Sequence, residues 1–286
     1  MNAETQILIS NSRDSWIRRV VPHQVRTAAR GLINAYRNRK TIEPYWLDIE
    51  QRGAKIKFLV ANIDGESWYS PYAKIENREM TFLQEKVLRP GMRVVEVGAH
   101  QGFTAALIGR WVGPEGQVFT FEPLRQNCDV ASKVFAENQL DNIKLTRAAV
   151  GEESGEVYIG STTTNPNVQT NGFLGEACPL VRLDDQIEGA VDLLKIDVEG
   201  YELHVLRGAK RLLETRPHLQ IEVHPGPISD FGGSVADMFK LIDVDAYDYW
   251  IQTQSTVSEP APYSLGKPIS HNSHLFCVRK DARAAA

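Results

Sequence analysis

Along residues 91–224, short apolar runs alternate with longer segments that are compatible with helices. Each apolar run predicts a strand, and each longer segment predicts a helix. This alternation is typical of βαβ units around a mainly parallel sheet. The expected strands cover 93–97, 117–121, 142–150, 191–197 and 219–224, and the expected helices cover about 103–111, 124–138 and 201–214.

The segment before this alternation has a different pattern. An apolar run at 56–60, turn residues at 62–66 and the run Ser-Trp-Tyr at 67–69 predict a β-hairpin within 55–72. A helix is expected over 79–88. It should end there, because Pro90 and Gly91 are residues that stop a helix.

The last third of the chain predicts fewer regular elements. A helix is expected over about 235–241, and strands are expected near 247–252 and 274–278. No long helix separates these two strands, so they are compatible with an antiparallel edge. The polar segment 151–185 contributes only two short strand candidates, at 157–159 and 179–181.

These patterns predict three parts. They are a basic helical extension over 1–50, one α/β domain over 51–280 with a ligand-binding core at 91–224, and a frayed tail at 281–286. In the extension, arginines are interleaved with apolar residues. We favour a helical cap with its arginines in water over peripheral contact with an anionic membrane or an acidic partner.

Composition narrows the class of protein. The 286 residues are 42% hydrophobic and 24% charged, with a net charge of -4, so no overall basicity favours nucleic acid. The three cysteines form no CxxC pair. No apolar run approaches the roughly 20 residues that cross a bilayer, and the N-terminus has no apolar signal core. A cytoplasmic protein is the expectation.

The turn after the strand at 93–97 is the first candidate for chemistry. Gly98 and Gly102 lie four residues apart between an apolar run and a helix start, which is typical of a backbone that approaches a nucleotide-like ligand closely. Glu96 lies within the apolar run. Because an unpaired buried carboxylate is costly, this acid requires a partner.

A second acid, Glu122, ends the next strand, where a carboxylate can accept hydrogen bonds from both hydroxyls of a ribose. That role fits NAD as well as S-adenosylmethionine. A dinucleotide fingerprint has the spacing G-x-G-x-x-G, whereas this turn lacks the middle glycine. Glu96 also disfavours a pyrophosphate and suits the cationic amino and sulfonium groups of S-adenosylmethionine, directly or through water.

Several motifs together resemble the FkbM family of S-adenosylmethionine-dependent methyltransferases. The resemblance covers about residues 79–224 and implies a class I methyltransferase fold, with a seven-stranded, mainly parallel sheet that has one antiparallel strand. It also implies O-methylation of a hydroxyl on a sugar, glycolipid or other natural product. Where the family often shows Ala-Asn-x-Gly, this chain has Ala99-His100-Gln101-Gly102, which leaves the role of His100 open. The motifs are 95–102, 121–123, 149–151, 183–184, Leu-Lys-Ile-Asp-Val-Glu-Gly-Tyr-Glu at 194–202, and Leu-Arg-Gly-Ala at 206–209.

Ligands of such sheets bind beyond the carboxyl ends of the strands, and this rule selects the candidate residues. The acceptor hydroxyl must be aligned with the methyl group and lose a proton. As its base we rank Asp197 and His224 first, then Glu199 and Glu222, with Lys195 beside them. The predicted cofactor-binding residues are Glu96, Gly98, Ala99, His100, Gly102, Phe103, Glu122, Pro123, Ala148 and Ala149.

Structural interpretations of the same residues stay open. Lys195 and Asp197 can form an ion pair, and Glu199 can cap the helix that starts near Tyr201. A metal site of His271 and His274 with Asp197 or Glu222 stays open, but the histidines have no dense ligand spacing, so no metal site is predicted.

Two other functions stay open as well. An NAD(P)-dependent Rossmann oxidoreductase lacks its glycine fingerprint here, and a non-catalytic scaffold would be free to lose the turn and Glu122. The expected partner is a small-molecule or glycan acceptor and not nucleic acid, and an oligomer is compatible with the sequence. Acceptor contacts are expected from 1–90, 161–178 and 225–234. Trp68, Tyr69 and Tyr72 fit either hairpin core, which we favour, or an aromatic platform.

Overall fold

A computed structural model describes residues 42–160, 167–169, 175–253 and 257–280. The predictions for 1–41 and for the tail at 281–286 lie outside this range. The described residues from Glu43 onward form one compact unit. None of its described helices is long and apolar enough to cross a membrane.

The unit is built on a central sheet in the order β13-β12-β14-β11-β10-β3-β4-β5. The five strands from β5 to β11 are parallel, and β14 runs antiparallel to both of its neighbours. The seven longer strands confirm the predicted fold class, a mainly parallel sheet with one antiparallel strand. The two-residue edge strand β13 is an eighth strand that was not predicted. The bounds are β3 Arg93–Val97, β4 Gln117–Phe121, β5 Ile143–Thr146, β10 Leu193–Ile196, β11 His218–Val223, β12 Tyr247–Thr253, β13 Ala261–Pro262 and β14 Ser273–Arg279.

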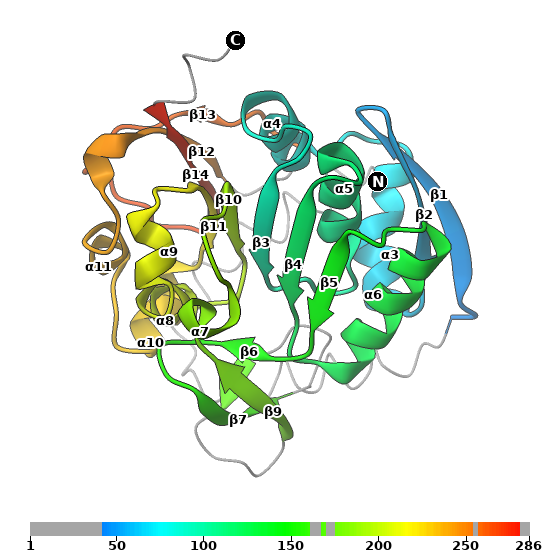
Figure 1. The fold of residues 1–286 in the computed structure, drawn as a ribbon, viewed down its shortest axis with the longest axis horizontal. Coiled ribbons are helices and arrows are strands. Elements are labelled where there is room, and N and C mark those ends of the chain that lie inside the picture. The colour runs from blue at the N-terminus through cyan, green and yellow to red at the C-terminus, as the bar shows by residue number, and fades with distance from the viewer. Residues whose placement is uncertain (1–41, 161–166, 170–174, 254–256, 281–286) are drawn as a thin grey trace, which may run out of the picture. The chain divides into compact units, whose positions relative to one another are not determined.

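Parallel strands place their carboxyl ends at one edge. In Figure 1, the arrowheads of β3, β4 and β5 point the same way, toward the small sheet that contains β6, β7 and β9. The inner strands are apolar on both faces because helices cover them; every residue of β10 is buried. The helices are α4 Arg78–Lys86, α5 Phe103–Val112, α6 Arg125–Glu137, α7 Leu183–Gln186, α8 Glu202–Arg207, α9 Lys210–Glu214, α10 Pro225–Asp230 and α11 Val235–Phe239, with a 3-10 turn at Val244–Ala246.

The predicted hairpin at 55–72 is wrong in its position. The hairpin joins β1 (Tyr45–Gln51) to β2 (Ala54–Val60) through Arg52 and Gly53, which both have positive φ. The segment expected as its second strand is instead α3 (Ile63–Tyr69), followed by a 3-10 turn at Ser70–Ala73. The Asn62 side chain accepts a hydrogen bond from the backbone N–H of Gly65, at 2.8 Å, and so caps a helix where a hairpin turn was expected.

Two long predicted elements are interrupted. The strand expected over 142–150 divides into β5 and β6 (Ala149–Val150), and β6 belongs to a second sheet in the order β6-β9-β7-β8. The helix expected over 201–214 divides at Gly208, where a Cβ atom would lie 1.9 Å from the carbonyl oxygen of Gly151. The other strands are β7 Gly155–Gly160, β8 Asn167–Gln169 and β9 Gly175–Val181, so both short strand candidates are confirmed.

His218, at the start of β11, makes stability depend on pH. It is 2% exposed, and its Nδ1 atom accepts the backbone N–H of Arg279 at 3.0 Å, which requires the neutral ring. Burial lowers its pKa from 6.5 to about 4. Between pH 6.5 and pH 4 the unfolded chain binds the proton and the folded chain does not. The stability that the neutral His218 ring contributes is therefore complete above pH 6.5 and is lost as the pH falls to about 4.

We expect His218→Asn to remove about 2–3 kcal/mol of that pH-dependent stability, because the amide oxygen can accept the same bond without titrating. Urea unfolding at pH 7.5 and at pH 4.5 would measure the difference between the two proteins. His271→Asn, at an exposed histidine, is the matched control. An equal loss on acidification in the wild type and in His218→Asn would contradict the prediction.

Candidate active site

A cavity of about 420 Å³ opens at the carboxyl edge of the central sheet, where the sequence places the site. Most of the candidate residues line it. Glu96, Gly102 and His224 do not. The candidates that line the cavity are Gly98, Ala99, His100, Phe103, Glu122, Pro123, Ala148, Ala149, Lys195, Asp197, Glu199 and Glu222.

The two glycines of the turn are required by packing against protein. Gly98 has φ 93°, and a Cβ atom there would lie 1.8 Å from the carbonyl oxygen of Asp197. Gly102 has φ 83° and lies against Ala131 and Phe135. The turn therefore packs directly on the end of β10, which brings His100 and Asp197 to the same cavity.

Glu122 holds the turn and the following helix from the end of β4. Its Oε2 accepts the backbone N–H of His100 at 2.8 Å, while Oε1 accepts the backbone N–H of Leu124 at 3.0 Å and the amide of Asn127 at 3.1 Å. The residue is 1% exposed, and burial raises its pKa to about 7. A carboxylate in this position faces the cavity with little competition from water.

Glu96 finds its partners inside the protein. It is fully buried, and it accepts hydrogen bonds from the hydroxyls of Thr120, at 2.9 Å, and Thr104. Burial raises its pKa, although Lys195 opposes the shift. Of these residues, Thr104 and Lys195 line the cavity, so Glu96 acts on the cavity through them.

Lys195, Asp197 and Glu222 form the charged floor of the cavity. Lys195 is 3% exposed, and its Nζ lies 3.9 Å from Glu79 and 4.0 Å from Glu96, so it pairs with these acids although the sequence suggested Asp197. Burial alone would lower the pKa of Lys195, but Glu79 and the other nearby carboxylates raise it.

Asp197 and Glu222 are neighbours on the cavity floor, and each carboxyl group shifts the pKa of the other. Burial and the neighbouring Glu222 hold the pKa of Asp197 well above its ordinary value. Burial would raise the pKa of Glu222 also, but His274 and His224 keep it well below its usual range. Two adjacent carboxyl groups with opposite shifts are typical of acid–base sites.

His224 lies behind this floor. It is 1% exposed, and its Nδ1 lies 2.6 Å from Glu202, while Nε2 lies 3.4 Å from Glu199 and 3.5 Å from Glu222. Burial would lower its pKa, but these three carboxylates raise it to about 12. An imidazolium held in this way cannot accept a proton, so the geometry disfavours His224 as a base.

One wall of the cavity is aromatic. The hydroxyl of Tyr69 lies 2.5 Å from Nδ1 of His100, and the Trp68 and His100 rings are 4.9 Å apart. Tyr72 stacks on Phe103. Trp68 is 42% exposed. The favoured assignment of Trp68, Tyr69 and Tyr72 to hairpin core is wrong, because they belong to α3 and the turn after it and line the cavity.

The predicted site residues leave out several polar residues of the site, three of which pair with charged groups on the cavity floor. Glu79 of α4 and His274 of β14 line the cavity, and Glu202 supports His224 from α8. Glu79 carries a detectable signal, because it lies four residues before Leu83 on the buried face of a predicted helix. Glu202 ends the motif at 194–202, but the resemblance assigns it no role, and His274 is considered only as a possible metal ligand.

This sheet, with a glycine turn after its first central strand and a buried acid after the next, defines a class I methyltransferase fold. A sequence model of the "Methyltransferase FkbM domain" matches residues 96–250, more than half of the chain. The chain therefore belongs to the FkbM methyltransferase family, and S-adenosylmethionine is its methyl donor.

Shorter similarities link the chain to other methyltransferases. It is 38% identical over 66 residues to TRM61, the catalytic subunit of a tRNA (adenine(58)-N(1))-methyltransferase from Cryptococcus neoformans var. neoformans serotype D, covering 23% of this chain and 15% of that protein. It is 39% identical over 58 residues to a protein-L-isoaspartate O-methyltransferase from Methanothermobacter thermautotrophicus, covering 20% of this chain and 27% of that protein. The chain thus matches only a small part of each relative.

Solved structures also resemble the chain. Methyltransferase FkbM from Methylobacillus flagellatus KT has a TM-score of 0.46 at 19% identity, over 68% of this chain and 49% of that one. SMU.1697c from Streptococcus mutans, a protein solved with SAH, has a TM-score of 0.43 at 12% identity, over 70% of this chain and 94% of that one.

Proposed function

We propose that the protein is an O-methyltransferase that acts on a hydroxyl group of a small molecule or glycan. The observation that carries this proposal is the Asp197–Glu222 carboxyl pair, which lies in the same cavity as Glu122. One end of the cavity has an acid suited to a ribose, and the floor has acids suited to a hydroxyl proton.

The residues of the cavity fit the cofactor. A volume of about 420 Å³ lies within the range of small-molecule sites. Glu122 would accept the ribose hydroxyls, and the carboxylates on the floor would face the cationic end. S-adenosylmethionine supplies an activated methyl group, which leaves a neutral thioether behind.

The chain's own residues would position the acceptor and take its proton. Trp68 and Tyr72 offer ring faces to the acceptor. Asp197 would accept the hydroxyl proton, because a raised pKa makes its ionised form the stronger base of the carboxyl pair. Lys195 would stabilise the ionised pair, and His224 would hold Glu222 and Glu199 in place.

Calorimetric titration separates this proposal from its alternatives. We expect saturable binding of S-adenosylmethionine and no binding of NAD. A non-catalytic scaffold would transfer no methyl group to any acceptor. A panel of hydroxylated glycans, small hydroxylated compounds and a tRNA, tested for transfer of labelled methyl, would identify the acceptor class; the tRNA is included because of the fungal relative. Label in the tRNA alone would overturn the proposed acceptor.

Glu122 provides a pH-dependent test of cofactor binding. With a pKa of about 7, it must lose a proton to accept two hydroxyls, so affinity for S-adenosylmethionine should fall below pH 7, by up to about tenfold per pH unit. We expect Glu122→Gln to weaken binding by about 1–3 kcal/mol at pH 8 and to flatten the pH dependence. Titrations at pH 6, 7 and 8 measure both effects.

The exposed acid Glu115 provides the matched control, since Glu115→Gln should bind as the wild type does. A folded Glu122→Gln protein with wild-type affinity at pH 8 would show that the ribose assignment is wrong.

A further inference from the structure

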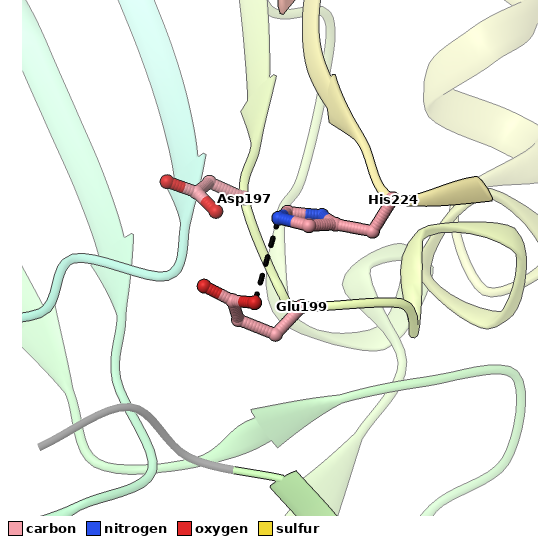
Figure 2. A group of neighbouring side chains, drawn as sticks. All are labelled: Asp197, Glu199 and His224. Atoms are coloured by element: carbon pink, nitrogen blue, oxygen red, sulfur yellow. Dashed lines mark ion pairs between the residues drawn. The ribbon is translucent and has the colours of Figure 1, made fainter. Parts of the chain in front are cut away.

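Three side chains at the end of the cavity floor have the composition of a metal site. Asp197, Glu199 and His224 each offer one ligand atom, and these atoms lie within 4.8 Å of one another. Figure 2 shows the two carboxylates and the imidazole ring facing a common space. Two ligands of one cation at about 2.1 Å each are at most about 4.2 Å apart, so small side-chain shifts would close the group.

The orientation of His224 matches that of a histidine ligand. Its Nδ1 lies 2.6 Å from Oε1 of Glu202, which is fully buried and also accepts the backbone N–H of Gly200 at 2.9 Å. This contact directs Nε2 toward Glu199. A carboxylate that holds the far nitrogen of an imidazole is the usual support of a metal-bound histidine.

The side chains around Asp197, Glu199 and His224 include more carboxylates than basic groups. Three basic side chains lie among six acids, and one of those three is His224 itself. A divalent cation would compensate this excess. The basic groups are Lys195, His224 and His274, and the acids are Glu79, Glu96, Asp197, Glu199, Glu202 and Glu222.

We propose that Asp197, Glu199 and Nε2 of His224 bind a divalent cation at the floor of the cavity. The cation would displace the proton from Nε2 to solvent, while Glu202 keeps the Nδ1 proton and positions His224. One imidazole nitrogen and two carboxylate oxygens suit Mn²⁺ or Zn²⁺. Asp197 and Glu199 line the cavity, so the remaining coordination positions face the space for the acceptor.

The cation would have a specific role in the proposed methyl transfer. This role rests on the proposed function. It would bind the acceptor hydroxyl and lower the pKa of that hydroxyl. Asp197 would have one oxygen on the cation and the other available for the proton. The acceptor O–H bond breaks, the methyl carbon exchanges its bond to sulfur for one to oxygen, and the charge of the sulfonium is lost.

Binding is tested without methyl transfer. Mn²⁺ is titrated into the full-length protein, and free Mn²⁺ is measured by electron paramagnetic resonance, with Zn²⁺ as the competitor. We expect one Mn²⁺ per chain, displaced by Zn²⁺. Glu199→Gln should weaken binding by about tenfold or more, and Glu202→Gln by about 10–100-fold.

Glu152 offers a matched control, because its Oε1 lies 2.7 Å from Nδ1 of His204, in a second carboxylate–histidine pair outside the cavity. Glu152→Gln should leave Mn²⁺ binding unchanged. Glu199 is partly exposed, so Glu199→Gln decides the question if Glu202→Gln does not fold.

In the binding experiment, the inference is overturned by no Mn²⁺ binding at about millimolar concentration, or by binding that neither cavity variant changes. Failure of the proposed function is separable. Mn²⁺ binding without S-adenosylmethionine binding would refute the function alone, while cofactor binding and methyl transfer without any cation would refute the inference alone.

Discussion

Replacing Asp197 with asparagine is expected to reduce the rate of methyl transfer by about 10²–10⁴-fold while the protein stays folded. The amide keeps the size of the side chain, but it cannot take a proton. Burial and Glu222 raise the pKa of Asp197 well above its ordinary value, so its ionised form is a stronger base than an ordinary carboxylate. Single-turnover rates with a bound acceptor would measure the effect.

The matched control lies just before the same strand, at its amino end. Asp192 accepts the backbone N–H of Arg93 at 2.8 Å, far from the cavity floor, and Asp192→Asn can keep that bond. We expect it to react at the wild-type rate. The affinity of Asp197→Asn for S-adenosylmethionine should change less than about tenfold, which would place the loss in the reaction and not in cofactor binding. A rate above about one tenth of the wild type would remove Asp197 from the role of base.

The position of the site could be predicted because it follows from topology. Strands β3, β4, β10 and β11 are buried on both faces, so their apolar runs stand out from the polar turns between them. Once these strands are taken as parallel, their carboxyl ends must meet at one edge. Gly98, Glu122 and Asp197 directly follow their strands there, and Glu222 is the last residue but one of β11. Both the cavity and the family match lie in this region.

The local geometry before β3 could not be predicted from the pattern alone. Asn62 and Gly65 are residues of hairpin turns and also of helix caps. The side chain of Asn62 bonds to Gly65 and starts a helix, while the hairpin forms earlier, at Arg52 and Gly53. The choice between the two depends on tertiary packing, since Phe58 of β2 contacts both Tyr69 and Phe103.

The direction of each charged side chain was also beyond the sequence. Strand alternation places Glu222 and His224 on one face, yet Glu222 lines the cavity and His224 is held behind it by Glu202. Glu202 comes from the first turn of α8, and Glu79, the partner of Lys195, comes from α4. Side chains from other helices and strands therefore decide which acid can act as a base and which acid only holds a neighbouring side chain in place.

Lys195 shows how strongly the site depends on such neighbours. Its ammonium group is buried between Glu79 and Glu96, at 3.9 Å and 4.0 Å, and Glu96 is fully buried. The charges compensate one another at side chains that have little contact with water. Removing one member leaves the others buried without a counter-charge, which costs more than the pair itself contributes.

We therefore expect Lys195→Met to lower the free energy of unfolding by about 3–5 kcal/mol, measured by urea denaturation at pH 7.5. Lys133→Met, at an exposed lysine of α6, should change it by less than about 0.5 kcal/mol. The double variant Lys195→Met/Glu79→Gln should be more stable than Lys195→Met, because it removes one of the two orphaned charges. If the double variant were less stable than the single one, the loss would come from packing of the lysine stem, and the charge pairing assigned to Lys195 would be wrong.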